Sequence, residues 1–348
     1  MQHLKLQQPA DNLYAALEAA RASPDDVAAW QLLGRCLSGL EVVNLQGAFR
    51  SADADKCIAA FSQHTAPCLA DLKSIDLSHN HLTAAGATAL AQYAARHWPQ
   101  LQSLDLSHNH LTATGTAALA EHAARHWPHL QTLNLSMNQL GADGMESLAH
   151  DAAPHWPELQ TLDLSHNHLT ANGAKPLASV AARHWPRLQN LNLSLNQLGD
   201  GGVTKLAQFG APHWPQLQSL ILSSNRIGDA GVTALAQDGA SHWPELQSLD
   251  LRQNQFGDTG VTALAQQAAQ HWPQLKTLNL SDNTLGEAGV AAIAEHAAPH
   301  WPQLHTLDLS WNRLGAMELT ALAEHAGPHW PQLKTLDISI NQIEGAPV

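Results

Sequence analysis

The sequence predicts a right-handed α/β solenoid, a stack of similar strand-helix units that together form one elongated domain. Three observations lead to this prediction. A block that begins at Leu101 recurs every 29 residues, each block opens with the spacing Leu-x-x-Leu-x-Leu, and each complete block closes with His-Trp-Pro. A repeat of this length is typical of solenoids, whose units bury their apolar faces against their neighbours. We therefore expect one core that grows with every added unit.

The repeat boundaries follow from an anchor leucine. It recurs at Leu72, Leu101, Leu130, Leu159, Leu188, Leu217, Leu246, Leu275, Leu304 and Leu333. Residues 1–39 predict an N-terminal helical cap, 40–71 a degenerate first repeat, 72–332 nine regular repeats and 333–348 a partial terminal repeat. The cap is expected because a solenoid end exposes apolar surface, which Trp30 is suited to cover. The last repeat has no closing helix, so we expect that self-association through the C-terminal end is open to this chain.

Each regular repeat predicts a short strand followed by a turn. In the second copy, Leu104 and Leu106 alternate with polar residues, as in a strand that is buried on one face. The asparagine that follows, Asn109 in this copy, recurs in all ten copies. Its amide can satisfy the backbone groups that a turn leaves unpaired. These asparagines predict a buried structural ladder.

The second half of each repeat predicts a helix. A polar residue such as Thr83 or Asp229 can accept hydrogen bonds from free N–H groups at the start of a helix. The run Gly-x-x-x-Leu-Ala then predicts about three helical turns, with leucine and alanine facing the strands. A proline such as Pro212 is expected to end the helix, and the tryptophans of His-Trp-Pro to form a buried ladder. Because a functional site is needed only once, nine copies of His-Trp-Pro indicate a structural role.

Composition narrows the class of partner and the location. The net charge is −13, with 30 acidic and 17 basic residues. Because nucleic-acid binding needs clustered cations, we expect no nucleic-acid partner. The three cysteines, an odd number, indicate a reducing compartment rather than a disulfide framework. No membrane span and no Sec signal is recognisable. We expect a soluble cytoplasmic protein, with delivery into a host cell by a route that needs no Sec signal as the alternative.

The repeat resembles a known family. Leu-x-x-Leu-x-Leu-Ser-x-Asn-x-Leu followed by a helix, with 28 or 29 residues per period, is similar to the leucine-rich repeat, specifically its ribonuclease-inhibitor-like class. The resemblance implies a horseshoe with a parallel sheet inside, helices outside and a ligand protein on the concave face. The Gly-x-x-x-Leu-Ala run also resembles repeats of bacterial effectors that work inside host cells, including the GALA type. Residues 1–40 lack the F-box pattern that the GALA type carries.

Candidate binding residues are the strand and turn residues expected on the concave face. Between the buried leucines lie an acidic or amide column, interrupted by Ile221, and beyond the strand a column that varies from copy to copy. An exposed aromatic side chain such as Trp311 is a typical binding anchor. The predicted partner-binding residues are Asp76, His79, Asp105, His108, Met137, Asp163, His166, Leu195, Ile221, Arg226, Asp250, Arg252, Asp308, Trp311 and Arg313.

The histidine pairs His79/His81, His108/His110 and His166/His168 invite a metal interpretation, since zinc prefers nitrogen ligands. The intervening copy has Met137 and Gln139 instead, so we expect no metal site. A response to pH fits better, because the acidic column beside these imidazoles is expected to stabilise their cationic form.

No catalytic set, phosphate-binding loop or cofactor motif is recognisable, so we expect a protein that is not an enzyme and needs no cofactor. The predicted function is protein binding on the concave face, as a bacterial effector that acts on a host protein. Two alternatives remain: an intracellular scaffold or inhibitor of an endogenous protein, and a substrate-recruiting adaptor for a ubiquitin ligase.

Overall fold

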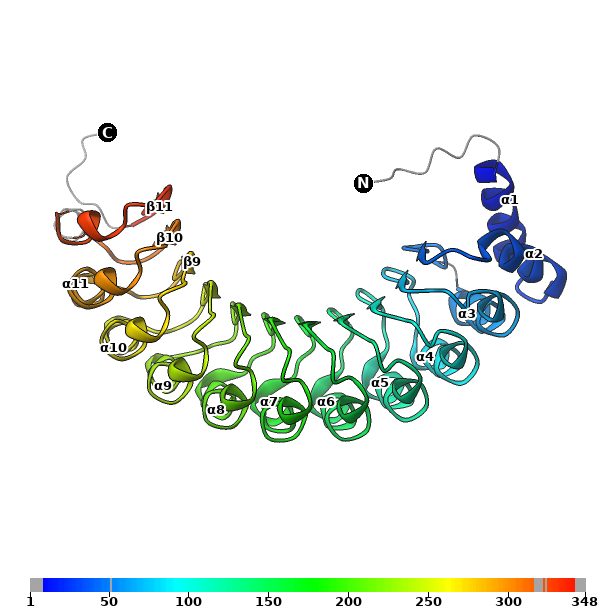
Figure 1. The fold of residues 1–348 in the computed structure, drawn as a ribbon, viewed down its shortest axis with the longest axis horizontal. Coiled ribbons are helices and arrows are strands. Elements are labelled where there is room, and N and C mark those ends of the chain that lie inside the picture. Colours follow the sequence, from blue (N-terminus) through cyan, green and yellow to red (C-terminus); the bar gives the residue numbers. More distant parts are fainter. Residues whose placement is uncertain (1–8, 51, 316–321, 323, 342–348) are drawn as a thin grey trace.

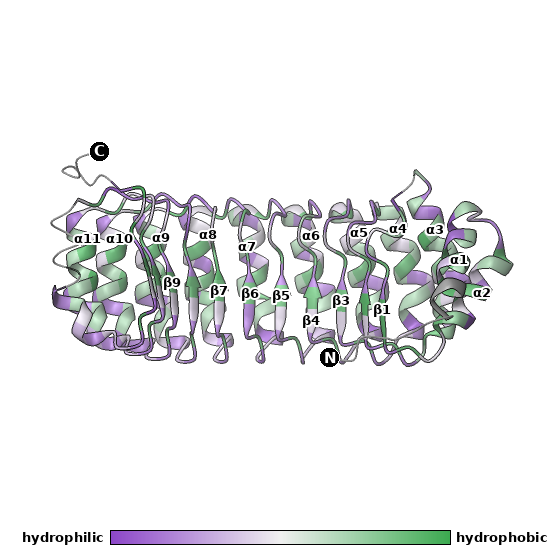
Figure 2. Ribbon diagram, turned by 90° about the horizontal axis from the view of Figure 1, so that it is seen from above, coloured by the Kyte–Doolittle hydropathy of each residue, from purple (hydrophilic) through white to green (hydrophobic). Residues whose placement is uncertain are grey.

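The chain forms a horseshoe with strands on its inner side and helices on its outer side (Figure 1). The computed structural model describes residues 9–50, 52–315, 322 and 324–341. Their strands and helices alternate along the chain, so the predicted α/β solenoid is confirmed. Seen from above, the strands run side by side across the short dimension of the arc (Figure 2).

The inner layer is one parallel sheet in which sequence order equals spatial order. Each strand has three residues, and neighbours pair in register at the same repeat position, as Leu104 pairs with Leu133. The strands are β1 Val42–Asn44, β2 Ser74–Asp76, β3 Ser103–Asp105, β4 Thr132–Asn134, β5 Thr161–Asp163, β6 Asn190–Asn192, β7 Ser219–Ile221, β8 Ser248–Asp250, β9 Thr277–Asn279, β10 Thr306–Asp308 and β11 Thr335–Asp337. In β11 the central Leu336 is exposed. The predicted self-association at this end stays a prediction, and residues 342–348 lie outside the described residues.

The outer layer consists of short helices that change their winding along their length. The α-helices are α1 Pro9–Ala22, α2 Val27–Leu37, α3 Ala54–Ala60, α4 Ala84–Ala89, α5 Thr112–Ala118, α6 Gly141–Ser147, α7 Thr170–Ser179, α8 Gly199–Lys205, α9 Asp229–Ala234, α10 Asp258–Ala263 and α11 Glu287–Ala292. After α4, for example, a π-helical turn Leu90–Ala94 and a 3-10 turn Ala95–His97 complete the segment. Pro212 lies in such a 3-10 turn, Ala211–His213, where the helical segment ends, as predicted. None of the described helices is long and apolar enough to cross a membrane.

The predicted asparagine ladder is confirmed. Asn196 is fully buried, and its Nδ2 donates to the carbonyl oxygens of Leu164 and Leu193 at 2.8 and 3.1 Å. Its Oδ1 accepts from the backbone N–H of Asn167 at 3.0 Å. The ladder therefore ties each turn to the preceding repeat.

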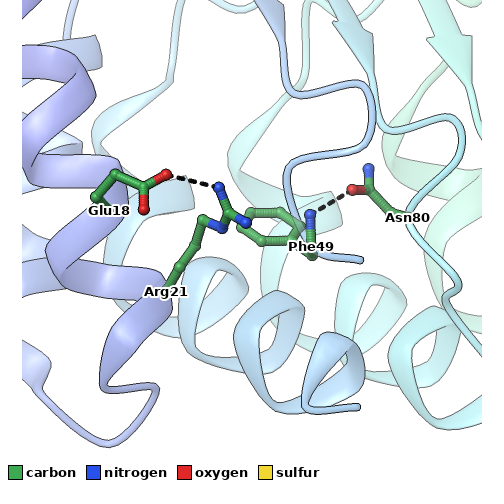
Figure 3. Close-up of polar contacts among 4 residues, drawn as sticks. All are labelled: Glu18, Arg21, Phe49 and Asn80. Atoms are coloured by element: carbon green, nitrogen blue, oxygen red, sulfur yellow. Dashed lines mark hydrogen bonds and ion pairs between the residues drawn. The ribbon is translucent and has the colours of Figure 1, made fainter. Parts of the chain in front are cut away.

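The same ladder reaches the irregular N-terminal repeat. The Oδ1 of Asn80 accepts from the backbone N–H of Phe49 at 2.6 Å (Figure 3). In the neighbouring α1, Arg21 and Glu18 form an ion pair at 2.8 Å. Residues 40–71 thus receive a hydrogen bond from the asparagine ladder, although paired strand positions such as Val42 and Ser74 are 32 residues apart instead of 29.

The tryptophans of His-Trp-Pro are buried along the whole array, as predicted. At the N-terminal end a series of tilted aromatic rings continues this layer from Trp98 through Phe61 and Phe49 to Trp30, with ring centres 6.0 to 6.3 Å apart. Trp30 belongs to α2 and is fully buried, and its indole N–H donates to the carbonyl oxygen of Pro24 at 3.0 Å. Helix α2 therefore covers the end of the core.

Helix starts follow the prediction at Thr83, whose hydroxyl accepts from the N–H of Ala85 at 3.2 Å. For the aspartates, the prediction named the wrong helix: they cap the helix of the next repeat and not their own. The carboxylate of Asp229 accepts from the N–H groups of Gly257 and Gly260, both at 2.8 Å, at the start of the following helix, α10. Asp200 and Asp258 do the same for α9 and α11. Stacking brings each carboxylate over the next repeat's free N–H groups, so these caps bind neighbouring repeats together.

Candidate functional site

The concave face carries the predicted polar columns. In β3, Ser103 and Asp105 flank the buried Leu104 and are themselves half-buried, and strands β2 to β10 share this arrangement. Their side chains therefore line the inner surface of the horseshoe. Because the strands pair in register, equivalent residues form continuous rows along the sheet.

The acidic column is already hydrogen-bonded within the protein. One oxygen of Asp105 accepts from the N–H of Ser107 at 2.8 Å, and the other accepts from the Nδ2 of Asn134 at 3.0 Å. The same sharing with a neighbouring asparagine occurs at Asp76 with Asn44 and at Asp163 with Asn192. These carboxylates therefore brace adjacent strands.

The variable column has one backbone conformation in every described copy. Its residues have φ between 53° and 59°, in the left-handed region, and they are His79, His108, Met137, His166, Leu195, Ser224, Gln253, Asp282, Trp311 and Ile340. This conformation costs roughly 1–2 kcal/mol for a residue with a Cβ. The turn therefore imposes the same backbone conformation in each described copy, and at this position the copies differ only in their side chains.

Two hollows lie along this edge of the sheet. The first, which we call the histidine groove, has a volume of about 400 Å³. It is lined by Arg50, His79, His81, His108, Asn109, His110, Met137, Gln139, His166 and His168. The rings of His79 and His108 stack with centres 3.9 Å apart and planes inclined by 18°, and those of His81 and His110 are 6.0 Å apart.

Arg50 closes the N-terminal end of the histidine groove. Its Nε donates to the carbonyl oxygen of His79 at 3.3 Å. The side chain lies over Gly47, where φ is 63° and an added methyl carbon would come within 2.5 Å of that Nε. Gly47 therefore serves both the left-handed turn and the close approach of the guanidinium.

The prediction that the acidic column favours charged histidines is wrong for His108. Partial burial and the neighbouring imidazoles of His79 and His166 lower the pKa of His108, and the opposing attraction of Asp105 does not compensate. Burial is the larger cause, because it disfavours the charged form, and repulsion from the stacked imidazole of His79 adds to it. His108 accordingly stays neutral to lower pH than an ordinary histidine.

The second hollow, which we call the Trp311 groove, has a volume of about 420 Å³. It is lined by Arg252, Gln253, Ser281, Asp282, Asp308, Ser310 and Trp311. The Trp311 side chain is 57% exposed, and Asp308 accepts from the N–H and the hydroxyl of Ser310 at 3.0 and 2.7 Å. An aromatic face thus lies beside groups of both charges.

Asp250 lies in the same column as Asp308, two strands away. Burial raises the pKa of its carboxyl, and repulsion from Asp308 adds to the effect. The N–H and the guanidinium of Arg252 oppose it. The ionised form of Asp250 is therefore less favourable in the folded protein than in water.

The structure divides the predicted binding residues into groups. His79, His108, Met137 and His166 meet in the histidine groove, and Arg252, Asp308 and Trp311 meet in the Trp311 groove. Eight others line neither hollow. Leu195, Arg226 and Arg313 are exposed, and Ile221 is half-buried in β7. The remaining four are the strand carboxylates Asp76, Asp105, Asp163 and Asp250.

The prediction of binding residues missed several lining residues. Arg50 was missed because the first repeat is out of phase with the others. His81, His110 and His168 were considered as metal ligands and as pH-responsive groups but not as binding residues, although they line the histidine groove. Asp282 belongs to the variable column and was left out of the predicted set. Among the described residues, no group of three or more histidine, cysteine or acidic side chains is placed to hold a metal ion.

Comparisons with known proteins identify the repeat. A leucine-rich repeat family model matches residues 72–140, and a second matches residues 157–178, 187–207, 215–236, 244–265 and 273–294. The chain belongs to the leucine-rich repeat family. A search of curated proteins found no match to this leucine-rich repeat chain.

Solved structures show the same fold. An internalin from Listeria monocytogenes matches with a TM-score of 0.53 and 19% identity, over 97% of this chain and 89% of that one. The mouse RP105/MD-1 complex matches with a TM-score of 0.55 and 21% identity, over 91% of this chain and 48% of that one. A TLR13–ssRNA13 complex matches with a TM-score of 0.53 and 20% identity, over 90% of this chain. Our leucine-rich repeat chain spans 37% of that TLR13 chain. At these identities the likeness concerns the fold.

Proposed function

We propose that this leucine-rich repeat protein is a non-catalytic module that binds a partner protein on its concave face, with the Trp311 groove as the anchor. The observation that carries the proposal is the exposed indole at the rim of a hollow that also presents Arg252 and Asp308. Trp is among the residues that most often dominate binding energy, and charged groups around it set orientation.

The concave face is large enough for such a role. With strands about 4.8 Å apart and about 15 Å of usable strand length, the eleven strands offer roughly 800 Å². One partner in a standard complex contributes about 800 Å². Much of this area consists of hydrogen-bonded Asp, Asn, Ser and Thr side chains, which favours a partner that presents hydrogen-bonding or basic groups.

The partner we propose is a host protein, and the chain a bacterial effector. This proposal rests on the resemblance of the Gly-x-x-x-Leu-Ala run to effector repeats. A translocation reporter fused to the chain is expected to reach the host cytoplasm only when the dedicated secretion system of the producing cell is intact. A reporter that stays in the producing cell would favour the scaffold or inhibitor role instead.

The binding role is tested by affinity capture from host and producer lysates, with quantitative mass spectrometry of the proteins retained. A specific partner is expected to be lost with Trp311→Ala. Phe209→Ala is the matched control, because Phe209 is 52% exposed but lies in the outer turn Leu206–Gly210. A partner retained equally by both variants would show that the Trp311 groove is not the anchor.

A further inference from the structure

We propose that the histidine groove is a second binding site, for a short acidic peptide segment with an apolar residue between its carboxylates, and that its affinity rises as the pH falls. This site is separate from the Trp311 groove, whose lining presents both acidic and basic groups. The inference goes beyond the proposed function and does not depend on it.

The groove has two rows of side chains. The first row, in the variable column, has three histidines with Met137 in the third place, and the second has three histidines with Gln139 in the third place. The rows span four consecutive repeats, or roughly 15 Å at the usual strand spacing. An extended peptide of about five residues covers this length. Met137 is 38% exposed and gives the centre of the groove one apolar contact.

The charge of the groove differs from that of the protein as a whole. The chain carries a net charge of −13, yet no carboxylate is among the described residues that line this hollow. Its titratable and charged lining groups are Arg50, His79, His81, His108, His110, His166 and His168. Asp105, the acidic group that acts on His108, has both oxygens engaged by Ser107 and Asn134. Among the lining residues that the structure describes, Arg50 is therefore the one permanent charge.

The stacked pair couples binding to pH. His79 and His108 lie face to face at 3.9 Å, so charging both without a counter-ion is unfavourable. A bound carboxylate supplies that counter-ion and favours protonation of the imidazoles. By linkage, protonation then favours binding of the carboxylate, and the affinity increases as the pH falls through the range near 6.5 in which histidines titrate.

The left-handed backbone does not by itself demand histidine at these positions. Gln253 has the same conformation as His79 and His108 in a later copy, with φ of 56°, and Gln139 takes it in the second row with φ of 60°. Glutamine is therefore a neutral replacement that this turn already accommodates, and it supplies the variants for the test.

The test is calorimetric titration of the full chain, in buffer with a chelator, with a synthetic peptide that has two glutamates on each side of one leucine. These glutamates stay ionised at about pH 5.5. Binding is expected to be at least about tenfold tighter at about pH 5.5 than at about pH 7.5. The peptide with glutamine in place of glutamate is expected to show no such gain.

The double variant His79→Gln/His108→Gln is expected to reduce this gain to less than about threefold. The matched control is His242→Gln/His271→Gln, because these histidines precede their strands, at the other end from the groove. Circular dichroism at both pH values checks that each variant is folded. Equal binding at both pH values, or an undiminished gain in the groove variant, would overturn the proposal. Tighter binding at low pH of a single-stranded oligonucleotide of equal charge would overturn the assignment to a peptide.

Discussion

The two grooves carry different side-chain chemistry on one backbone framework. Both lie where the strands end, both are built on the left-handed turn of the variable column, and both are close to 400 Å³ in volume. One is lined by imidazoles and one guanidinium, the other by an indole with acidic and basic groups beside it. The comparison teaches that the repeat fixes the backbone, so that binding chemistry is decided by the side chains placed on it.

The largest effect is expected from a substitution in the backbone framework that both grooves share. Asn196 lies between them and is fully buried with hydrogen bonds to both neighbouring turns. Asn196→Ala leaves several backbone groups unpaired and is expected to lower the free energy of unfolding by about 3 kcal/mol. Urea denaturation followed by tryptophan fluorescence measures it. Gln237→Ala, at an exposed site on the outer turn Leu235–Gly239, should cost less than about 0.5 kcal/mol.

A second prediction separates the grooves by partner. Trp311→Ala is expected to weaken binding of the captured partner by about 2 kcal/mol, or roughly thirtyfold, because an exposed indole at a groove contributes most when it is buried by the partner. Met137→Ala should leave that affinity within about twofold, since Met137 belongs to the other groove. Surface plasmon resonance with both variants decides the matter. Equal losses would mean that one partner spans both grooves.

A third prediction concerns the acidic side of the Trp311 region. Because burial raises the pKa of Asp250, its ionisation weakens the folded state, and stability falls as the pH rises through that raised pKa. Asp250→Asn is expected to raise the free energy of unfolding by about 0.5 kcal/mol at neutral pH, with a smaller gain in acid. The neighbouring Asn279 shows that asparagine accepts the same backbone hydrogen bond. Denaturation at several pH values tests this, and a gain that grows in acid would contradict it.

The smallest predicted effect concerns the histidine groove without ligand. The pKa of His108 is lowered, so the unfolded chain binds its proton more readily, and stability falls as the pH drops below about 6.5. His108→Gln removes this term and should reduce the acid-induced fall in melting temperature by about 1 °C. Differential scanning calorimetry at two pH values measures it, with His242→Gln as the control. An unchanged fall would show that His108 does not contribute.

Much of the fold was predictable because the same spacing of leucine, asparagine and tryptophan recurs in copy after copy. The alternation of Leu104 and Leu106, the asparagine after them and the buried tryptophan all occupy the places that their chemistry demands. The caps were misplaced because a carboxylate such as Asp229 finds its N–H partners in the next repeat. Local sequence shows which side chain can cap, whereas stacking decides which helix is capped.

The sequence predicted which equivalent residues form columns on the concave face, but not which of them line a common groove. The variable column pointed to His79, His108 and Trp311, but the pKa of His108 depends on its burial and on a ring stacked on it from the preceding repeat. Arg50 was not found from the repeat pattern because residues 40–71 form an irregular repeat, with 32 residues between paired strand positions.

The sequence by itself determined the period, the buried leucines, asparagines and tryptophans, and hence the solenoid, because these properties depend on spacing within one unit. Only the tertiary structure decided which side chains share a groove, which carboxylates are already engaged and which imidazoles stack. Those contacts join residues about 29 positions apart, such as His79 and His108, and their distances and charges are set by how the units stack.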